Sequence, residues 1–129
     1  MRQLIDRPNS ATWIAEEGDQ MSGFAIVEWS RVADQTVAYV QTLEVAPENR
    51  KLGIARELLR RIEGSAAAAG AQALWLHVAE QNAAAISLYE AHGYLPTGRE
   101  EDYYAEGLPA LIYAKPLEPR QVAFPSPYP

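Results

Sequence analysis

The sequence has no cysteine among its 129 residues and only two histidines. Without cysteine the chain has no disulfide bonds, no thiolate ligands for a metal and no mechanism through a covalent cysteine intermediate. The two histidines, His77 and His92, lie fifteen positions apart and match no zinc-ligand spacing. We therefore expect no metal centre.

Long apolar runs are also absent, since none approaches the roughly 20 residues that a transmembrane helix requires. The first residues, Met1 to Asp6, lack the basic-then-apolar pattern of a secretory signal. The formal net charge is −6, whereas non-specific binding of nucleic acid needs a broad basic surface. These features predict a cytoplasmic protein that binds neither membranes nor nucleic acid.

Hydrophobic residues make up 48% of the chain and charged residues 22%, as in ordinary globular proteins. A chain of this length suits one domain. Five of the nine prolines lie in residues 116–129, and proline cannot donate a hydrogen bond to a neighbouring strand. We therefore expect one domain over residues 1–117 and a proline-rich tail over residues 118–129.

Alternating β-branched and aromatic residues in the first third predict an antiparallel meander with turns at Gly18 and Ala33. From Ile54 the apolar period becomes helical, ending near Gly70. The predicted strands are 12–16, 23–31, 36–45, 73–79, 94–104 and 108–115, and the predicted helices are 54–69 and 82–91.

The apolar strand over residues 73–79 is typical of a strand buried on both faces of a parallel pair. Strand, helix and strand then form a right-handed crossover. We predict an α/β fold with a mixed sheet, in which an antiparallel meander precedes a parallel β-α-β crossover, a second helix and a final antiparallel hairpin.

Basic residues gather where the crossover helix begins. Five of the eleven fall within twelve positions, namely Arg50, Lys51, Arg56, Arg60 and Arg61. A helix N-terminus preceded by a glycine, here Gly53, binds phosphate through free N–H groups and the helix dipole. The other interpretation is an ordinary turn with solvated arginines, and the pattern alone does not separate the two.

Two motifs in register with this arrangement resemble the GNAT superfamily of acyl-CoA-dependent N-acetyltransferases. The run from Arg50 to Ala55 (Arg-Lys-Leu-Gly-Ile-Ala) is similar to the family's pyrophosphate loop, and the run from Asn82 to Tyr94 is similar to its later Asn, Leu-Tyr and Gly-aromatic segment. Residues 102–104 and 109–112 resemble the branch that acetylates protein N-termini, including ribosomal-protein alanine acetyltransferases. The resemblance covers about residues 22–117.

The resemblance implies that acetyl-CoA binds as a cosubstrate between the splayed parallel strands. Its pantetheine arm would pair with the first of these strands, and its phosphates would lie on the loop and helix start. Asn82 would contact the cofactor through its amide, although an ordinary helix N-cap also explains this residue. The implied cofactor-binding residues are Leu43, Glu44, Val45, Arg50, Lys51, Leu52, Gly53, Ile54, Ala55 and Asn82.

The resemblance also implies direct attack of an amine on the thioester, with a tyrosine that protonates the departing thiolate. Tyr89 holds the matching position, and a phenol is a suitable donor to a thiolate. Its other interpretation is a core aromatic residue of the second helix. The general base is open between His77, which stands where the N-terminal branch often has glutamate, Glu44 and the solvent. His77 as a packed strand residue and Glu44 as a solvated one are equally open.

The acidic run from Glu100 to Asp102 precedes Tyr103 and Tyr104 on the strand that borders the acceptor side in the family. This run either draws a cationic amine or is a solvated hairpin. Tyr104 is a candidate wall of the acceptor site.

The front of the chain departs from the family, whose members usually have a first strand and two helices that build the floor of the acceptor site. Here Met1 to Asp6 are a candidate remnant of that segment. We expect an N-acetyltransferase, or, as alternatives, a non-catalytic CoA-binding module or a structural subunit. A homodimer is the commonest way for a partner to close such a site.

Overall fold

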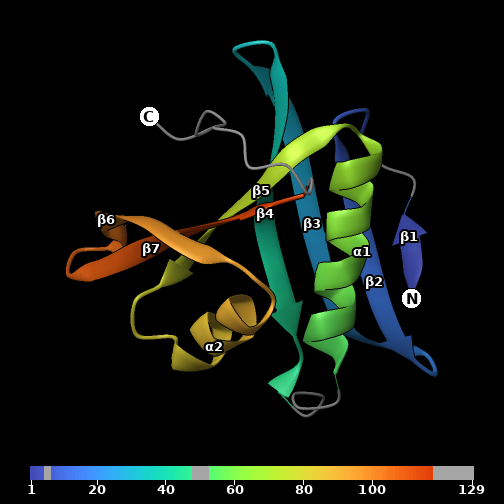
Figure 1. The fold of residues 1–129 in the computed structure, drawn as a ribbon. Helices are drawn as coiled ribbons and strands as arrows, with labels where there is room; N and C mark the ends of the chain where they lie inside the picture. Colours follow the sequence, from blue (N-terminus) through green and yellow to red (C-terminus); the bar gives the residue numbers. More distant parts are fainter. Residues whose placement is uncertain (5–6, 48–52, 118–129) are drawn as a thin grey trace.

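The computed structural model describes residues 1–4, 7–47 and 53–117 (Figure 1). Within these residues one mixed sheet has the strand order β1-β2-β3-β4-β5-β7-β6. The elements are β1 (Arg2–Leu4), β2 (Ser10–Glu17), β3 (Gln20–Val32), β4 (Gln35–Val45), α1 (Ile54–Ala68), β5 (Ala71–Ala79), α2 (Ala83–Ala91), β6 (Leu95–Ala105) and β7 (Leu108–Pro116).

The predicted topology is confirmed. Strands β1 to β4 form the antiparallel meander, β4 and β5 pair in parallel across the α1 crossover, and β6 and β7 form the final hairpin. Ala33 and Asp34 both have positive φ, of 50° and 65°, which is the geometry of a tight two-residue hairpin turn. Strands β2, β3, β4, β5 and β7 extend beyond their predicted ranges by one to three residues at an end, because hydrogen-bonded pairing continues into the turns. Both helices are one residue shorter than predicted, and β6 is shifted by one residue.

Helix α1 packs along β2, β3, β4 and β5 through one apolar stripe. Leu58, Leu59, Ile62 and Ala66 on this stripe are fully buried. On the same side of the sheet, α2 adds Tyr89 to the core. Neither of these helices is long and apolar enough to cross a membrane.

The opposite face of the sheet is covered by no helix of the described ranges. Three half-buried side chains lie on this face, those of Ile14, Phe24 and Ile26. They point there because they alternate along their strands with residues that face α1. Only residues 5–9 separate β1 from β2, which is too short for the two helices that the family usually inserts. The predicted remnant of the front segment is therefore an edge strand at Arg2–Leu4, and the tail over residues 118–129 lies outside the described residues.

Candidate active site

A cleft opens where β4 and β5 diverge. The parallel pairing of these strands runs from Thr36–Ala71 to Tyr39–Trp75, and beyond it the two strands separate (Figure 1). A β-bulge at Gln41 interrupts the pairing of β4 with β3, because Val40 and Thr42 face consecutive residues of β3. A bulge bends and twists its strand, so it turns the end of β4 away from β5.

The cleft has a volume of about 990 Å³ and is bounded by the start of β3, the end of β4, the start of α1 and one side of α2. The last residues of β4 pair with β3 on one edge only, so their backbone groups on the other edge face the cleft. The lining residues are Met21, Ser22, Gly23, Phe24, Leu43, Glu44, Val45, Ala46, Pro47, Gly53, Ala55, Arg56, Asn82, Ala84, Ala85, Leu88 and Tyr89.

The N-terminus of α1 meets the cleft. Gly53 takes a left-handed φ of 77°, which glycine adopts without strain, and among the described residues no side chain caps the helix. Ala55 and Arg56 line the cleft from the first turn. Such a helix start attracts anions through its N–H groups and its dipole, so this end of the cleft suits a phosphate group.

Of the predicted phosphate loop, Arg50, Lys51 and Leu52 lie outside the described residues. Gly53 and Ala55 lie on the cleft as expected. The side chain of Ile54 instead packs against the core beside Gly23, so any contact of this residue with a cofactor involves its backbone.

Asn82 is the N-cap of α2. Its Oδ1 accepts a hydrogen bond from the backbone N–H of Ala85 at 3.2 Å, and the residue also lines the cleft. The capping interpretation is thus correct, and it leaves the amide nitrogen of the same side chain as a donor for a ligand.

Tyr89 lies at the cleft from the middle of α2 and is only 7% exposed. Burial and the nearby Tyr104 raise the pKa of its phenol from 10 to about 12. The edge of its ring meets Tyr94, with ring centroids 5.7 Å apart. The interpretation as a core aromatic residue is confirmed, and Tyr89 also borders the cleft, where its phenol stays protonated; its catalytic role stays a prediction.

His77 lies on the other face of the sheet, because it alternates on β5 with Leu76 and Val78, which face the helices. Its ring stacks on Tyr103 and its Nε2 is 3.6 Å from Oε1 of Glu100. Burial lowers the pKa of the imidazole below its ordinary value of 6.5, and the carboxylate of Glu100, which raises it, does not compensate. At neutral pH the ring is therefore uncharged and can accept a proton.

An irregularity in β6 brings the tyrosines to His77. Between the pairs Glu100–Ala110 and Ala105–Leu108, four residues of β6 lie opposite a single residue of β7. Asp102 adopts a φ of 52°, and its Oδ1 accepts a hydrogen bond from the Gly107 N–H at 2.7 Å. The extra residues place Tyr103 over β5, although β7 lies between β5 and β6 in the sheet.

Comparison with known proteins agrees with this geometry. The model of the acetyltransferase (GNAT) family matches residues 1–94. The chain belongs to the GNAT family. It is 34% identical to the streptothricin acetyltransferase of Streptomyces lavendulae over 113 residues, which cover 84% of this chain and 59% of that protein. It is also 34% identical over 102 residues to the ribosomal protein bS18-alanine N-acetyltransferase of Salmonella typhimurium, covering 77% of this chain and 66% of that enzyme.

The chain thus spans less than two thirds of the length of both relatives. Among solved structures, nourseothricin acetyltransferase superposes with a TM-score of 0.79 at 33% identity, over 86% of this chain and 67% of that one. The splayed strands, the helix start and the two helices on one face are therefore the GNAT fold.

Glu44 occupies a different position from the other predicted members of this GNAT cleft. Leu43 and Val45 face the helices and pack on the core, whereas Glu44 is exposed and points to the opposite face. It lines the cleft only at the strand edge. The alternation expected from the sequence is correct, and it places the Glu44 carboxylate on the same face as His77.

Several cleft residues were not identified from the sequence. The sequence places Arg56 in the basic cluster but gives no sign that it borders the cleft, and it gives none for the β3 residues Met21 to Phe24. Only the strand register could have identified these β3 residues, because Gly23 and Phe24 reach the cleft by pairing with Val45 and Glu44.

Proposed function

We propose that the protein is an acyl-CoA-dependent N-acetyltransferase that moves the acetyl group of acetyl-CoA to a primary amine by direct attack. Acetyl-CoA is the cosubstrate of the GNAT family. The observation that supports the proposal most strongly is the meeting of three parts in one cleft: the open edge of β4, the uncapped start of α1 and the buried phenol of Tyr89.

The pantetheine arm of acetyl-CoA has amides that match the free edge of β4 at Leu43, Glu44 and Val45. Its diphosphate suits the N–H groups at the start of α1, with Arg56 and the neighbouring Arg50 and Lys51 supplying positive charge. The amide nitrogen of Asn82 is available to the cofactor from the other side of the cleft.

In the proposed reaction a neutral amine attacks the carbonyl carbon of the thioester and the C–S bond breaks. One proton leaves the nitrogen and one proton reaches the departing thiolate, so the products are an amide and free CoA. Tyr89 donates to the thiolate and regains a proton from solvent. His77 is proposed as the base that deprotonates the incoming ammonium, with Glu44 as the second candidate.

The acceptor is a small amine or a peptide N-terminus. The names of the two relatives include streptothricin and the alanine of a ribosomal protein. On the face that holds His77, the carboxylate of Glu100 and the ring of Tyr103 offer an anionic, aromatic surface, and the ring of Tyr104 meets that of Tyr103 edge to face. Such a surface attracts a cationic amine before it loses its proton.

A second candidate is a CoA-binding module without catalysis. It is favoured by the five-residue connection between β1 and β2, because within the described residues no helix forms a floor on the acceptor side. A second copy of the chain would supply that floor, so we propose a homodimer. The cytoplasm is the proposed location, because the bS18 relative is named for a ribosomal substrate.

A thiol-release assay with acetyl-CoA and a panel of amines, including an alanine-initiated peptide, tests the function. We expect turnover by the wild type and a loss of about 100-fold in kcat for Tyr89→Phe. Thermal stabilisation by CoA without turnover on any amine supports the binding module instead. No stabilisation by millimolar CoA contradicts both.

Charge reversal at Arg50 and Lys51 separates the cofactor site from the fold. We expect weaker CoA binding at an unchanged melting temperature, because the buried stripe of α1 consists of Leu58, Leu59, Ile62 and Ala66, which these substitutions leave intact. Reversal at Arg60 is the matched control, since this residue is not part of the cleft. Sedimentation velocity reports the dimer, and a monomer at the assay concentration refutes it.

A further inference from the structure

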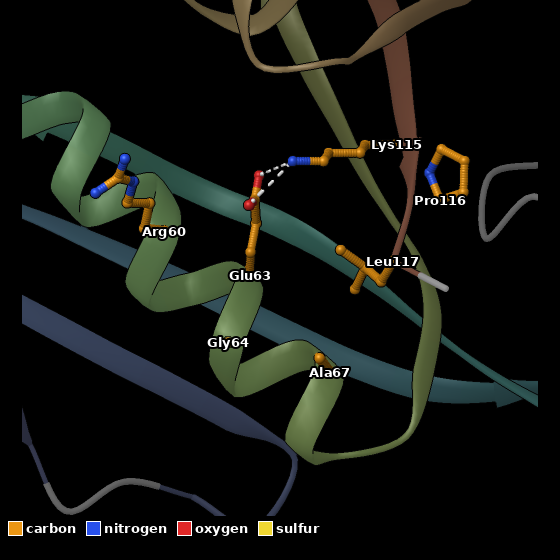
Figure 2. Close-up of a pocket in the computed structure, with 7 residues that line it drawn as sticks. All are labelled: Arg60, Glu63, Gly64, Ala67, Lys115, Pro116 and Leu117. Carbon is orange, nitrogen blue, oxygen red and sulfur yellow. Dashed lines mark hydrogen bonds and ion pairs between the residues drawn. The ribbon is translucent and has the colours of Figure 1, made fainter. Parts of the chain in front are cut away.

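A partly buried polar network links the two helices that border the cleft. The hydroxyl of Tyr94, just after α2, donates to Oε2 of Glu63 on α1 at 2.7 Å. Lys115 at the end of β7 donates to both oxygens of the same carboxylate, at 3.2 and 3.3 Å. Figure 2 shows Lys115 reaching from β7 to Glu63 across a shallow hollow.

Tyr94 is the member that contacts the active site. It is 1% exposed, and its backbone N–H donates to the carbonyl of Tyr89 at 3.0 Å. Its ring also meets the ring of Tyr89 edge to face, at an interplanar angle of 62°. Tyr94 therefore holds Tyr89, whose phenol is proposed to protonate the thiolate, at both the backbone and the ring.

Glu63 fixes Tyr94 in turn. Burial, reinforced by the charge of Glu63 and the hydrogen bond to it, raises the pKa of the Tyr94 phenol well above its ordinary value. The hydroxyl thus stays a donor, and its direction is set by the carboxylate. Because Glu63 is on α1 and Tyr94 follows α2, this bond also sets the spacing of the two cleft walls.

Lys115 keeps the carboxylate of Glu63 compensated. The side chains of Lys115 and Glu63 are 28% and 18% exposed, and an unpaired charge at that depth is costly. The ammonium also lies 5.6 Å from the centroid of the Tyr94 ring. The stem of Lys115 passes close to Gly93, the residue before Tyr94.

We propose that Glu63 is a positioning residue of the acetyl-transfer site, which orients Tyr89 through Tyr94 and is itself held by Lys115. This inference rests on the proposed function, since it assigns Glu63 a role in the step that Tyr89 performs. None of the three network residues lines the cleft, so Glu63 acts without touching either substrate.

The chain offers a matched control. The hydroxyl of Tyr113 on β7 donates to Oε2 of Glu90 on α2 at 2.8 Å. This is a second tyrosine–carboxylate hydrogen bond, and it joins α2 to the sheet. It does not involve Tyr94. Glu90→Ala therefore removes a comparable bond without affecting the proposed chain of contacts to Tyr89.

The test compares kcat and the KM for acetyl-CoA in Glu63→Ala, Glu63→Gln and Glu90→Ala. We expect Glu63→Ala to lower kcat about tenfold, because a misplaced catalytic group reacts more slowly, with KM within about twofold. Glu63→Gln keeps an oxygen that accepts from Tyr94 and should recover most of the rate. Glu90→Ala should retain the wild-type kcat.

The decisive measurement repeats Glu63→Ala in a Tyr89→Phe background. If Glu63 acts through Tyr89, the second substitution causes no further loss of kcat. An equal tenfold loss in both backgrounds, or no loss in the wild-type background, overturns the proposal. Should Glu63→Ala fail to fold by circular dichroism, Lys115→Met and Tyr94→Phe replace it in the same cycle.

These outcomes differ from a failure of the proposed function. A wild-type protein without turnover refutes the function, and the role of Glu63 with it. Turnover that is insensitive to Tyr89→Phe refutes the assignment of the acid. Turnover that depends on Tyr89 refutes the positioning role alone if it does not depend on Glu63, or if it depends on Glu63 equally with and without the Tyr89 phenol.

Discussion

The imidazole of His77 lies flat against the ring of Tyr103, with centroids 4.1 Å apart and planes 4° from parallel. The stacking covers His77, whose side chain is 9% exposed. Burial is the main cause of its lowered pKa. If His77 is the base, we expect kcat/KM to fall as the pH drops through this lowered pKa, below 6.5. His77→Gln should remove that acidic limb, and a limb that persists in the variant assigns the base elsewhere.

The same pKa makes stability depend on pH. In the unfolded chain the His77 imidazole has its ordinary pKa of 6.5, so below that value the unfolded state binds the proton more tightly than the folded state. The contribution of His77 to the free energy of unfolding is therefore complete above pH 6.5 and decreases as the pH falls towards the folded pKa. Urea titrations between pH 5 and 8 measure this slope. Tyr103→Leu should reduce it, since water then reaches the ring.

For Tyr89 we expect the opposite pH dependence, a loss of stability as the pH rises. Its pKa rises from 10 to about 12 on folding, so the unfolded chain loses the phenol proton first. The contribution is fully present below pH 10 and is lost as the pH rises through 12, which amounts to about 3 kcal/mol of unfolding free energy. Between pH 9 and 12 the free energy of unfolding, measured by urea denaturation, should fall more steeply with pH for the wild type than for Tyr89→Phe. Equal slopes would mean that the phenol is hydrated in the folded protein.

Asn82 allows its two roles to be separated. Asn82→Asp keeps an oxygen that accepts from the Ala85 N–H, replaces the amide donor with an oxygen and adds a negative charge, which is favourable at a helix N-terminus. We therefore expect a melting temperature no lower than that of the wild type and weaker acetyl-CoA binding. Asn82→Ala removes the cap as well and should cost about 1 kcal/mol of stability. Calorimetric titration with CoA and thermal melts measure both effects. Equal CoA affinity in Asn82→Asp and the wild type leaves capping as the only role.

The elements that were predictable from sequence are those with a local signal. The stripe of Leu58, Ile62 and Ala66 identifies α1, and the apolar run over residues 73–79 identifies the buried strand, because period and burial are properties of neighbouring residues. The same is true of Asn82 as a cap. The family motif added Tyr89, which the pattern alone shows only as a core aromatic residue.

The relationships that were not predictable join residues far apart in the chain. The β6 bulge depends on the count of residues opposite Pro109, and no local pattern reveals that it places Tyr103 over His77. Glu63 and Lys115 are 52 positions apart, so their pairing requires the crossover and the final hairpin to be assembled first. The roles of Arg50, Lys51 and Leu52 remain predictions, because these residues lie outside the described part of the chain.

Gly23 shows how closely β3 approaches the start of the cleft. A Cβ at this position would lie 2.8 Å from the backbone oxygen of Glu44 and 3.2 and 3.3 Å from Leu58 and Ile54. The oxygen belongs to paired strand backbone and cannot move away alone. Gly23→Ala should therefore push β4 or α1 outward, costing about 1–3 kcal/mol of stability and weakening CoA binding because both elements line the cleft.

Gly64 on α1 is the matched control for Gly23. A Cβ there meets nothing within 4 Å, and alanine in a helix is more stable than glycine by about 0.5–1 kcal/mol. Gly64→Ala should raise the melting temperature and leave CoA affinity unchanged, while Gly23→Ala lowers both. Because each variant adds the same methyl group, opposite signs would show that the crowding at Gly23, and not the added methyl group itself, causes the loss. A Gly23→Ala protein as stable as the wild type would show that the approach of β3 to β4 is looser than this geometry.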